Sequence, residues 1–165
     1  LKPALYSRFL AAILILLLGS LSCTQIDLFE KTAVIPGHSW KSSFKPSFTF
    51  TIKDTSAPYM VYFIIRHDDR YSYKNIYVNL YAKGPGQDTA QGVPYDIRLA
   101  TDESGWLGSG MDDIYEHRTQ LTPRAADKLF YFKKPGDYTF TIEQIMREDP
   151  LKNVWNTGIR IEKLQ

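Results

Sequence analysis

Alternation of apolar and polar residues with a period of two predicts β-strands along most of the chain. In residues 44–53, Phe44, Phe48, Phe50 and Ile52 share one parity, while lysine, serine and threonine occupy the other. A strand with this alternation buries one face and leaves the other in solvent. The same reasoning predicts shorter strands at residues 76–82, 95–100, 138–146 and 155–162.

Residues 59–66 (YMVYFIIR) form a continuous run of β-branched and aromatic residues, which predicts a central strand buried on both faces. Turn-forming residues cluster between the strands, at residues 54–58, 83–92, 103–110 and 134–137. About eight short strands with such turns predict an all-β fold, a two-sheet antiparallel β-sandwich that is jelly-roll-like or immunoglobulin-like. Helical periodicity is weak, and single helical turns are expected only at residues 111–116 and 123–129.

The first 22 residues differ in composition from the rest of the chain. Lys2 and Arg8 give a short cationic start, residues 9–18 (FLAAILILLL) are apolar, and small residues follow. This order is that of a secretory signal peptide. Ten apolar residues span roughly 15 Å as a helix, which is about half the thickness of a bilayer core.

Cys23 is the only cysteine of the chain, so no intrachain disulfide can form. The segment Ser20-Leu21-Ser22-Cys23 resembles the lipobox of bacterial lipoproteins, with its leucine one position closer to the cysteine than usual. In that family of signals the cysteine thiol receives a diacylglyceryl group and the peptide is cut before it. We therefore expect a lipoprotein signal peptide at residues 1–22, a lipidated N-terminus and short tether at 23–30, and one sandwich domain at 31–165.

Removal of residues 1–22 changes the net charge of the protein. Lys2 and Arg8 account for two of its 20 lysines and arginines, which leaves 18 against 18 aspartates and glutamates. The expected mature domain is therefore neutral and has no global field that would attract nucleic acid.

Several short segments in a fixed order carry a resemblance to a known family. They are residues 58–59 (PY), 75–77 (NIY), 102–110 (DESGWLGSG), 112–114 (DDI), 136–140 (GDYTF), 143–147 (EQIMR) and 158–163 (GIRIEK). Together with the expected lipidated cysteine, these segments resemble the gliding-motility lipoprotein family GldH of the Bacteroidota over essentially the whole chain.

The resemblance implies an envelope lipoprotein associated with gliding and with the type IX secretion machinery that gliding shares. It implies no enzymatic activity, and Cys23 is the one functional position that it transfers. We therefore expect a non-catalytic accessory or scaffold component that binds envelope proteins and needs no cofactor beyond its covalent lipid. The residues after Cys23 (TQIDLFEK) contain no dense acidic run, which favours a periplasm-facing domain.

The sequence offers no catalytic constellation. His38, His67 and His117 are widely spaced and lie in no metal-ligand motif. His67 falls in a polar segment, residues 66–70 (RHDDR), which predicts a solvated hairpin tip rather than a histidine–carboxylate pair. The chain contains neither a G-x-S-x-G motif nor a Walker loop.

Four acidic residues around a glycine-rich segment are weak candidates for a calcium site: Asp102, Glu103, Asp112 and Asp113. Hard carboxylate oxygens suit calcium. Their spacing matches no EF-hand loop, however, and acidic turns are common without a metal, so no metal site is expected here.

Four aromatic or apolar residues are candidates for partner contact. Trp106 and Leu107 lie in a polar, glycine-rich loop, where a tryptophan either anchors a partner or plugs the end of the sandwich. Tyr77 and Tyr81 share one parity of a strand, so they either form a platform for stacking sugar rings or pack beneath a loop. A glycan- or peptidoglycan-binding module is therefore the alternative function.

Overall fold

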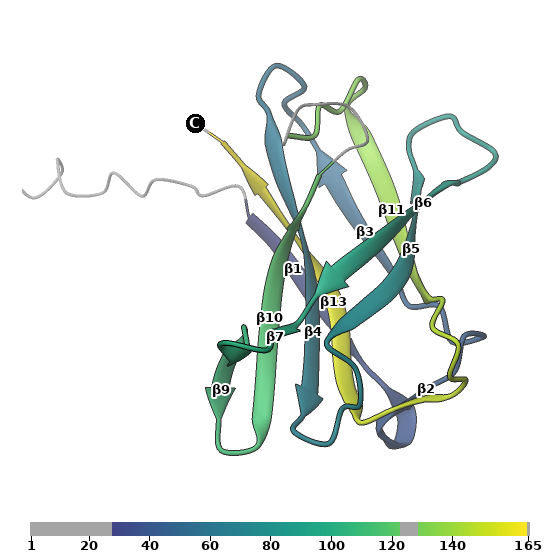
Figure 1. Ribbon diagram of the computed structural model, residues 1–165. Helices are drawn as coiled ribbons and strands as arrows, with labels where there is room; N and C mark the ends of the chain where they lie inside the picture. The colour runs from purple at the N-terminus through teal and green to yellow at the C-terminus, as the bar shows by residue number, and fades with distance from the viewer. Residues whose placement is uncertain (1–27, 123–128, 165) are drawn as a thin grey trace, which may run out of the picture.

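Two antiparallel sheets form the body of the computed structural model, which describes residues 28–122 and 129–164 (Figure 1). The five-stranded sheet has the order β1 (Leu28–Val34), β13 (Val154–Lys163), β4 (Tyr59–Asp68), β10 (Ile114–Leu121) and β9 (Ser109–Met111). The four-stranded sheet has the order β3 (Ser47–Ile52), β11 (Gly136–Gln144), β5 (Asn75–Lys83) and β6 (Gln91–Arg98). The predicted all-β sandwich is confirmed.

Short elements close the ends of the sandwich. A single turn of 3-10 helix, η1 (Pro36–His38), leads into β2 (Ser39–Trp40), which pairs with β12 (Leu151–Lys152). A second small pair joins β7 (Ala100–Thr101) to β8 (Gly105–Trp106). Within the described residues, no helix has the length and apolar character needed to cross a membrane.

The core lies between the inward faces of the two sheets, as the alternation in the sequence predicts. In β3, Phe48, Phe50 and Ile52 are buried while the residues between them are exposed. Phe50 meets Phe140 of the neighbouring strand β11 edge to face, with ring centroids 5.0 Å apart. Aromatic pairs of this kind contribute about 1 kcal/mol beyond the burial of their area.

Strand β4 has the central position that its apolar run predicts, between β13 and β10. Burial on both faces holds for only part of the strand. Its inward side chains are buried, but on the outward parity Ile64 is 1% exposed whereas Met60 and Tyr62 are half-buried.

The predicted helical turn at residues 111–116 is wrong. These residues form a tight hairpin between β9 and β10, in which Met111 pairs with Ile114 across a two-residue turn. Asp112 has a φ of 57°, the left-handed conformation that such turns require and that aspartate tolerates. Most of the other expected turn, residues 123–129, lies outside the described residues.

Strand β1 begins at Leu28, three residues before the domain boundary expected at residue 31. It pairs with β13 along its whole length, from Leu28 opposite Glu162 to Val34 opposite Asn156. The half-buried Phe29 packs on Phe50 across the sandwich, with ring centroids 5.5 Å apart. The segment expected to be a tether therefore contributes to the sheet and to the core.

Candidate functional site

The expected lipidation site, Cys23, lies outside the described residues. Only five residue steps separate it from Leu28, the first residue of β1. A fully extended chain covers at most ~3.6 Å per residue, so β1 begins within about 18 Å of the cysteine. A lipid on Cys23 would therefore hold this corner of the sandwich close to a membrane surface.

Trp106 of the short strand β8 is surrounded by aromatic rings. Its ring centroid is 4.4 Å from that of His67, 5.8 Å from that of Tyr115 and 6.2 Å from that of Tyr71. The side chain is half-buried by these contacts. This geometry favours the packing role for Trp106, as a plug at the end of the sandwich, over the role of partner anchor.

Leu107 and Met111 point the other way, into solvent. Leu107 is 51% exposed and Met111 is 78% exposed, and the glycine-rich segment Gly108–Gly110 joins them. We call the segment from Leu107 to Met111 the apolar tip. Exposed apolar surface commonly marks contact sites for other proteins, and these two large apolar side chains are the exposed ones of this segment.

Strand β9, which carries Met111 of the apolar tip, lies at the other end of the molecule from the start of β1 (Figure 1) and at the opposite edge of the five-stranded sheet. In the register of the sheet, Leu28 is level with Met60 of β4. Met111 is level with Asp68, at the other end of β4, and belongs to the opposite edge strand. Ordinary strand spacing and rise put the two corners roughly 30 Å apart.

His67 and His117 form a buried pair beside Trp106. His67 is fully buried and His117 is 3% exposed, and their Nε2 atoms are 2.9 Å apart. The predicted solvated hairpin tip is therefore wrong for His67, because the inward parity of β4 continues through this residue. The Asp68 carboxylate is bound by Arg70 and Trp155, so it does not form a catalytic pair with His67.

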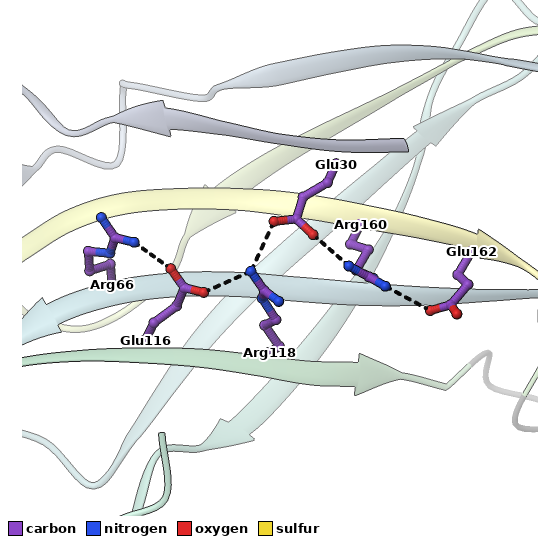
Figure 2. Close-up of polar contacts among 6 residues, drawn as sticks. All are labelled: Glu30, Arg66, Glu116, Arg118, Arg160 and Glu162. Carbon is purple, nitrogen blue, oxygen red and sulfur yellow. Dashed lines mark hydrogen bonds and ion pairs between the residues drawn. The ribbon is translucent and has the colours of Figure 1, made fainter. Parts of the chain in front are cut away.

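Six charged residues of alternating sign form one chain of ion pairs on the outer face of the five-stranded sheet (Figure 2). We call this chain the charge ladder. Its successive nitrogen–oxygen distances are 2.6, 3.1, 3.1, 3.0 and 3.3 Å in the order Arg66, Glu116, Arg118, Glu30, Arg160 and Glu162. Three arginines and three glutamates make this face neutral and connect β4, β10, β1 and β13.

Within the charge ladder, Arg118 makes the contact that crosses the most strands. It extends from β10 to Glu30 on β1, so its side chain passes over β4 and β13. In the register, the residues on this path are Ile64 and Gly158, and Gly158 has no side chain to obstruct it. Long arginine stems commonly cover apolar surface in this way. The register therefore places Ile64 directly beside Arg118, where the aliphatic part of the arginine side chain is positioned to cover it.

Two substitutions of Arg118 separate its charge from its stem. We expect Arg118→Met to lower the free energy of unfolding by about 1 kcal/mol, the range for exposed ion pairs. We expect Arg118→Ala to cost about 1 kcal/mol more, because Ile64 becomes exposed. Urea denaturation measures both losses. High salt should shrink the ion-pair part that both variants lose and leave the difference between the two variants unchanged. Equal losses for the two variants would show that the stem contributes nothing.

Tyr77 and Tyr81 lie on the outer face of the four-stranded sheet. Tyr77 is 44% exposed. The ring of Tyr81 lies over Gly92 of β6, where an added Cβ would be 2.7 Å from the ring. Its hydroxyl donates to the Glu143 carboxylate at 2.6 Å, and Lys45 binds the same group at 2.7 Å. These contacts give Tyr81 a packing role, and they do not favour a two-ring platform for sugars.

The acidic residues proposed as weak calcium candidates lie in two separate turns. Asp102 forms an ion pair with Lys74, whereas Asp112 and Asp113 form the turn between β9 and β10. The Lys74 ammonium lowers the pKa of Asp102. Across residues 28–122 and 129–164, no three acidic, histidine or cysteine side chains come together as a possible metal site.

The charge ladder and the histidine pair were not found from sequence. Both depend on strands distant in the chain: Glu30 is 130 residues from Arg160, and His67 is 50 residues from His117. The alternation of residues could have separated the two groups. Glu116 and Arg118 lie on one face of β10, and His117 lies between them in the sequence, on the other face.

Comparison with known proteins gives concordant results. A family model described as GldH lipoprotein matches residues 27–161. A protein of Christiangramia forsetii described as a gliding motility lipoprotein GldH homolog is 26% identical over 171 residues, covering 96% of each chain. The family match begins just before β1 and ends within β13, so it spans both sheets of the sandwich. This chain therefore belongs to the GldH lipoprotein family.

Proposed function

We propose that this protein is a lipid-anchored, non-catalytic component of the cell envelope that supports gliding motility and type IX secretion through protein–protein contacts. The observation that carries the proposal is the family match across the whole sandwich, together with the name of the Christiangramia relative. Lipidation of Cys23 and a periplasm-facing domain are parts of the proposal that the sequence of the N-terminus supports.

In this proposal, one end of the sandwich attaches to the membrane and the opposite end binds the partner. The anchor holds the domain at the start of β1, which follows Cys23 closely. The apolar tip, at the diagonally opposite corner, is presented away from the membrane surface toward other envelope proteins. We propose that Leu107 and Met111 contact the partner directly and that Trp106 holds the tip in place.

Two of the sheet edges, β1 and β6, are less suited to partner binding than the apolar tip. Lys31 of β1, an edge strand of the five-stranded sheet, occupies the inward parity beside Phe29, with its ammonium 5.9 Å from the phenyl ring. An inward-directed charge opposes the pairing of a further strand. Pro94 lies in β6, an edge strand of the four-stranded sheet, and proline cannot donate a backbone hydrogen bond to a neighbour.

Affinity purification from native membranes tests the proposal. We expect the wild-type protein to recover gliding or secretion components, measured by quantitative mass spectrometry. The double variant Leu107→Asp/Met111→Asp should lose at least about tenfold in recovery, because two apolar contacts of this size contribute more than 1.4 kcal/mol. Its thermal unfolding should stay unchanged, because both side chains are exposed.

Ile145→Asp is the matched control. Ile145 is 40% exposed, but it follows β11, which belongs to the four-stranded sheet. Recovery equal to wild type is expected for this variant. The proposed function is wrong if purification recovers no envelope machinery and deletion of the gene leaves both type IX secretion and surface movement intact. If Ile145→Asp lowers recovery as much as the double variant does, the assignment of partner binding to the apolar tip is wrong.

A further inference from the structure

The buried histidine pair connects the five-stranded sheet to the segment that carries the apolar tip. His67 projects inward from β4 and His117 from the adjacent strand β10. The Nδ1 atom of His67 is 2.7 Å from the backbone carbonyl oxygen of Asp68. A carbonyl oxygen only accepts, so Nδ1 carries a proton and donates to it.

This assignment fixes the state of the second contact. When neutral, His67 has a bare Nε2, which accepts a hydrogen bond from the Nε2–H of His117 across 2.9 Å. The hydrogen bond between the two histidines therefore forms when both rings are neutral. One added proton is still compatible with the contact, because an imidazolium can donate to a neutral imidazole. A second proton is not, because two N–H donors would then face each other with no acceptor between them.

We propose that the His67–His117 pair is a proton-sensitive latch that holds the segment from Leu99 to Met111 closed and releases it when both rings are protonated. Trp106 packs on the His67 ring, and Gly108 lies against His117, where an added Cβ would be 2.9 Å from the Nε2 atom. Separation of the two rings therefore disturbs both residues.

The latched segment is attached to the rest of the domain mainly at its start, where Leu99 is fully buried in the core. Outside the small β7–β8 and β9–β10 pairs, its backbone hydrogen bonds to other segments run from Leu99 and Ala100 to the carbonyl of Lys74, and the Lys74 ammonium binds Asp102. Segments with few hydrogen bonds and exposed side chains open at a lower free energy than the whole domain does. Opening of this segment should therefore expose the two rings to water at a lower free energy than unfolding of the whole domain.

The charged groups near the pair offset an added proton only in part. The Asp68 carboxylate is bound by Arg70 and Trp155, and Glu116 and Arg118 point to the opposite face of the sheet within the charge ladder. Tyr71 and Tyr115 contribute neutral rings, and Arg98 adds positive charge at the rim of a cavity of about 550 Å³ that borders His117.

These surroundings lower the pKa of both rings. Burial, together with the neighbouring His67, lowers the pKa of His117 to about 4. Burial also lowers the pKa of His67, against smaller opposing effects of the Asp68 carbonyl, which accepts a hydrogen bond from the ring, and of the Asp68 carboxylate charge. A histidine with a lowered pKa favours the closed state above its ordinary pKa near 6.5 and progressively favours the open state below it. The latch is therefore closed at neutral pH and loosens as the pH falls from 6.5 toward 4.

Amide hydrogen exchange of the full-length lipoprotein in detergent tests the latch. From pH 7.5 to pH 5.0 the opening constant of residues 99–111 should rise at least about 30-fold for one extra proton bound on opening, and up to about 1000-fold for two. Protection of the central strands β4 and β13 should change much less, because the latch is local. Unchanged protection of residues 99–111 over this range would overturn the proposal.

Proton NMR of the histidine rings gives a readout that needs no variant. His67 and His117 should titrate together, with midpoints below the ordinary histidine value near 6.5. Nitrogen shifts should show a proton on Nδ1 of His67 and on Nε2 of His117. Independent titrations of these two rings at the ordinary value would contradict the latch.

The double variant His67→Asn/His117→Gln keeps amide donors at both ring positions and removes the titration. It should abolish the pH dependence of exchange, whereas His38→Gln should leave that dependence intact. The latch itself does not depend on the proposed function; control of partner binding by the latch does, because Leu107 lies on the released segment. Opening without any change in envelope-protein recovery at pH 5.0 would remove that control and keep the latch.

Discussion

Cys23→Ser should move the protein from the membrane fraction to the aqueous fraction of lysed cells. Each buried methylene contributes about 0.8 kcal/mol, and a lipoprotein carries two or three acyl chains, so the loss is on the order of 10 kcal/mol or more. Labelling cells with a fatty-acid probe should mark the wild-type protein and leave the variant unmarked. The fold should be unaffected, because β1 begins only at Leu28.

Ser22→Ala is the matched control for this prediction, because it keeps a small residue directly before the cysteine. It should label and fractionate as the wild type does. If Cys23→Ser stays in the membrane fraction and wild-type protein carries no probe, residues 1–22 act as an uncleaved anchor. The leucine of the segment lies two residues before the cysteine instead of three, and the labelling result decides whether that departure matters.

Strand positions could be predicted from the sequence because a two-residue period is a local property. The alternation in residues 44–53 and the turn at residues 134–137 place β3 and the start of β11 within a few residues of their observed bounds. The position of β4 inside its sheet followed from its apolar run. These inferences need only the parity of neighbouring residues, which a single sequence displays.

Other features depend on contacts that no local pattern displays. Arg66 and His67 are adjacent, yet one belongs to the exposed charge ladder and the other is fully buried, because they lie on opposite faces of β4. Read as the polar run RHDDR, they predict a turn. Only the pairing of β4 with β10 supplies the partners, Glu116 and His117, that stabilise each of them.

The same limit applies to Trp106. Its glycine-rich surroundings predict a loop, whereas the structure has two short strands there, β8 and β9. The burial of Trp106 depends on rings from β4 and β10, which the local sequence does not display. Of the two neighbours Trp106 and Leu107, Leu107 is the exposed one. Sequence reasoning therefore singled out both residues and could not decide which of the two neighbouring side chains is exposed.

Gly158→Ala should lower the free energy of unfolding by about 3 kcal/mol, at the upper end of the usual cost of overpacking. Gly158 lies in β13 opposite Thr32 of β1. An added Cβ would be 2.2 Å from the carbonyl oxygen of Lys31 and 2.8 Å from the Cα of Thr32. Both obstacles are backbone atoms, so they cannot rotate away, and β1 must shift from its partner instead.

Gly110→Ala is the matched control, because its nearest obstacle is the ring of Tyr115 at 2.9 Å, a side chain able to turn aside. It should cost less than about 1 kcal/mol, since alanine is otherwise the better strand residue. Urea denaturation of both variants measures the difference, and equal losses would contradict the backbone clash. Because β1 is the first strand after Cys23, Gly158→Ala should also make residues 28–34 accessible to protease while the protein remains bound to the membrane. The missing side chain at position 158 lets β1 lie close enough to β13 to complete the sheet.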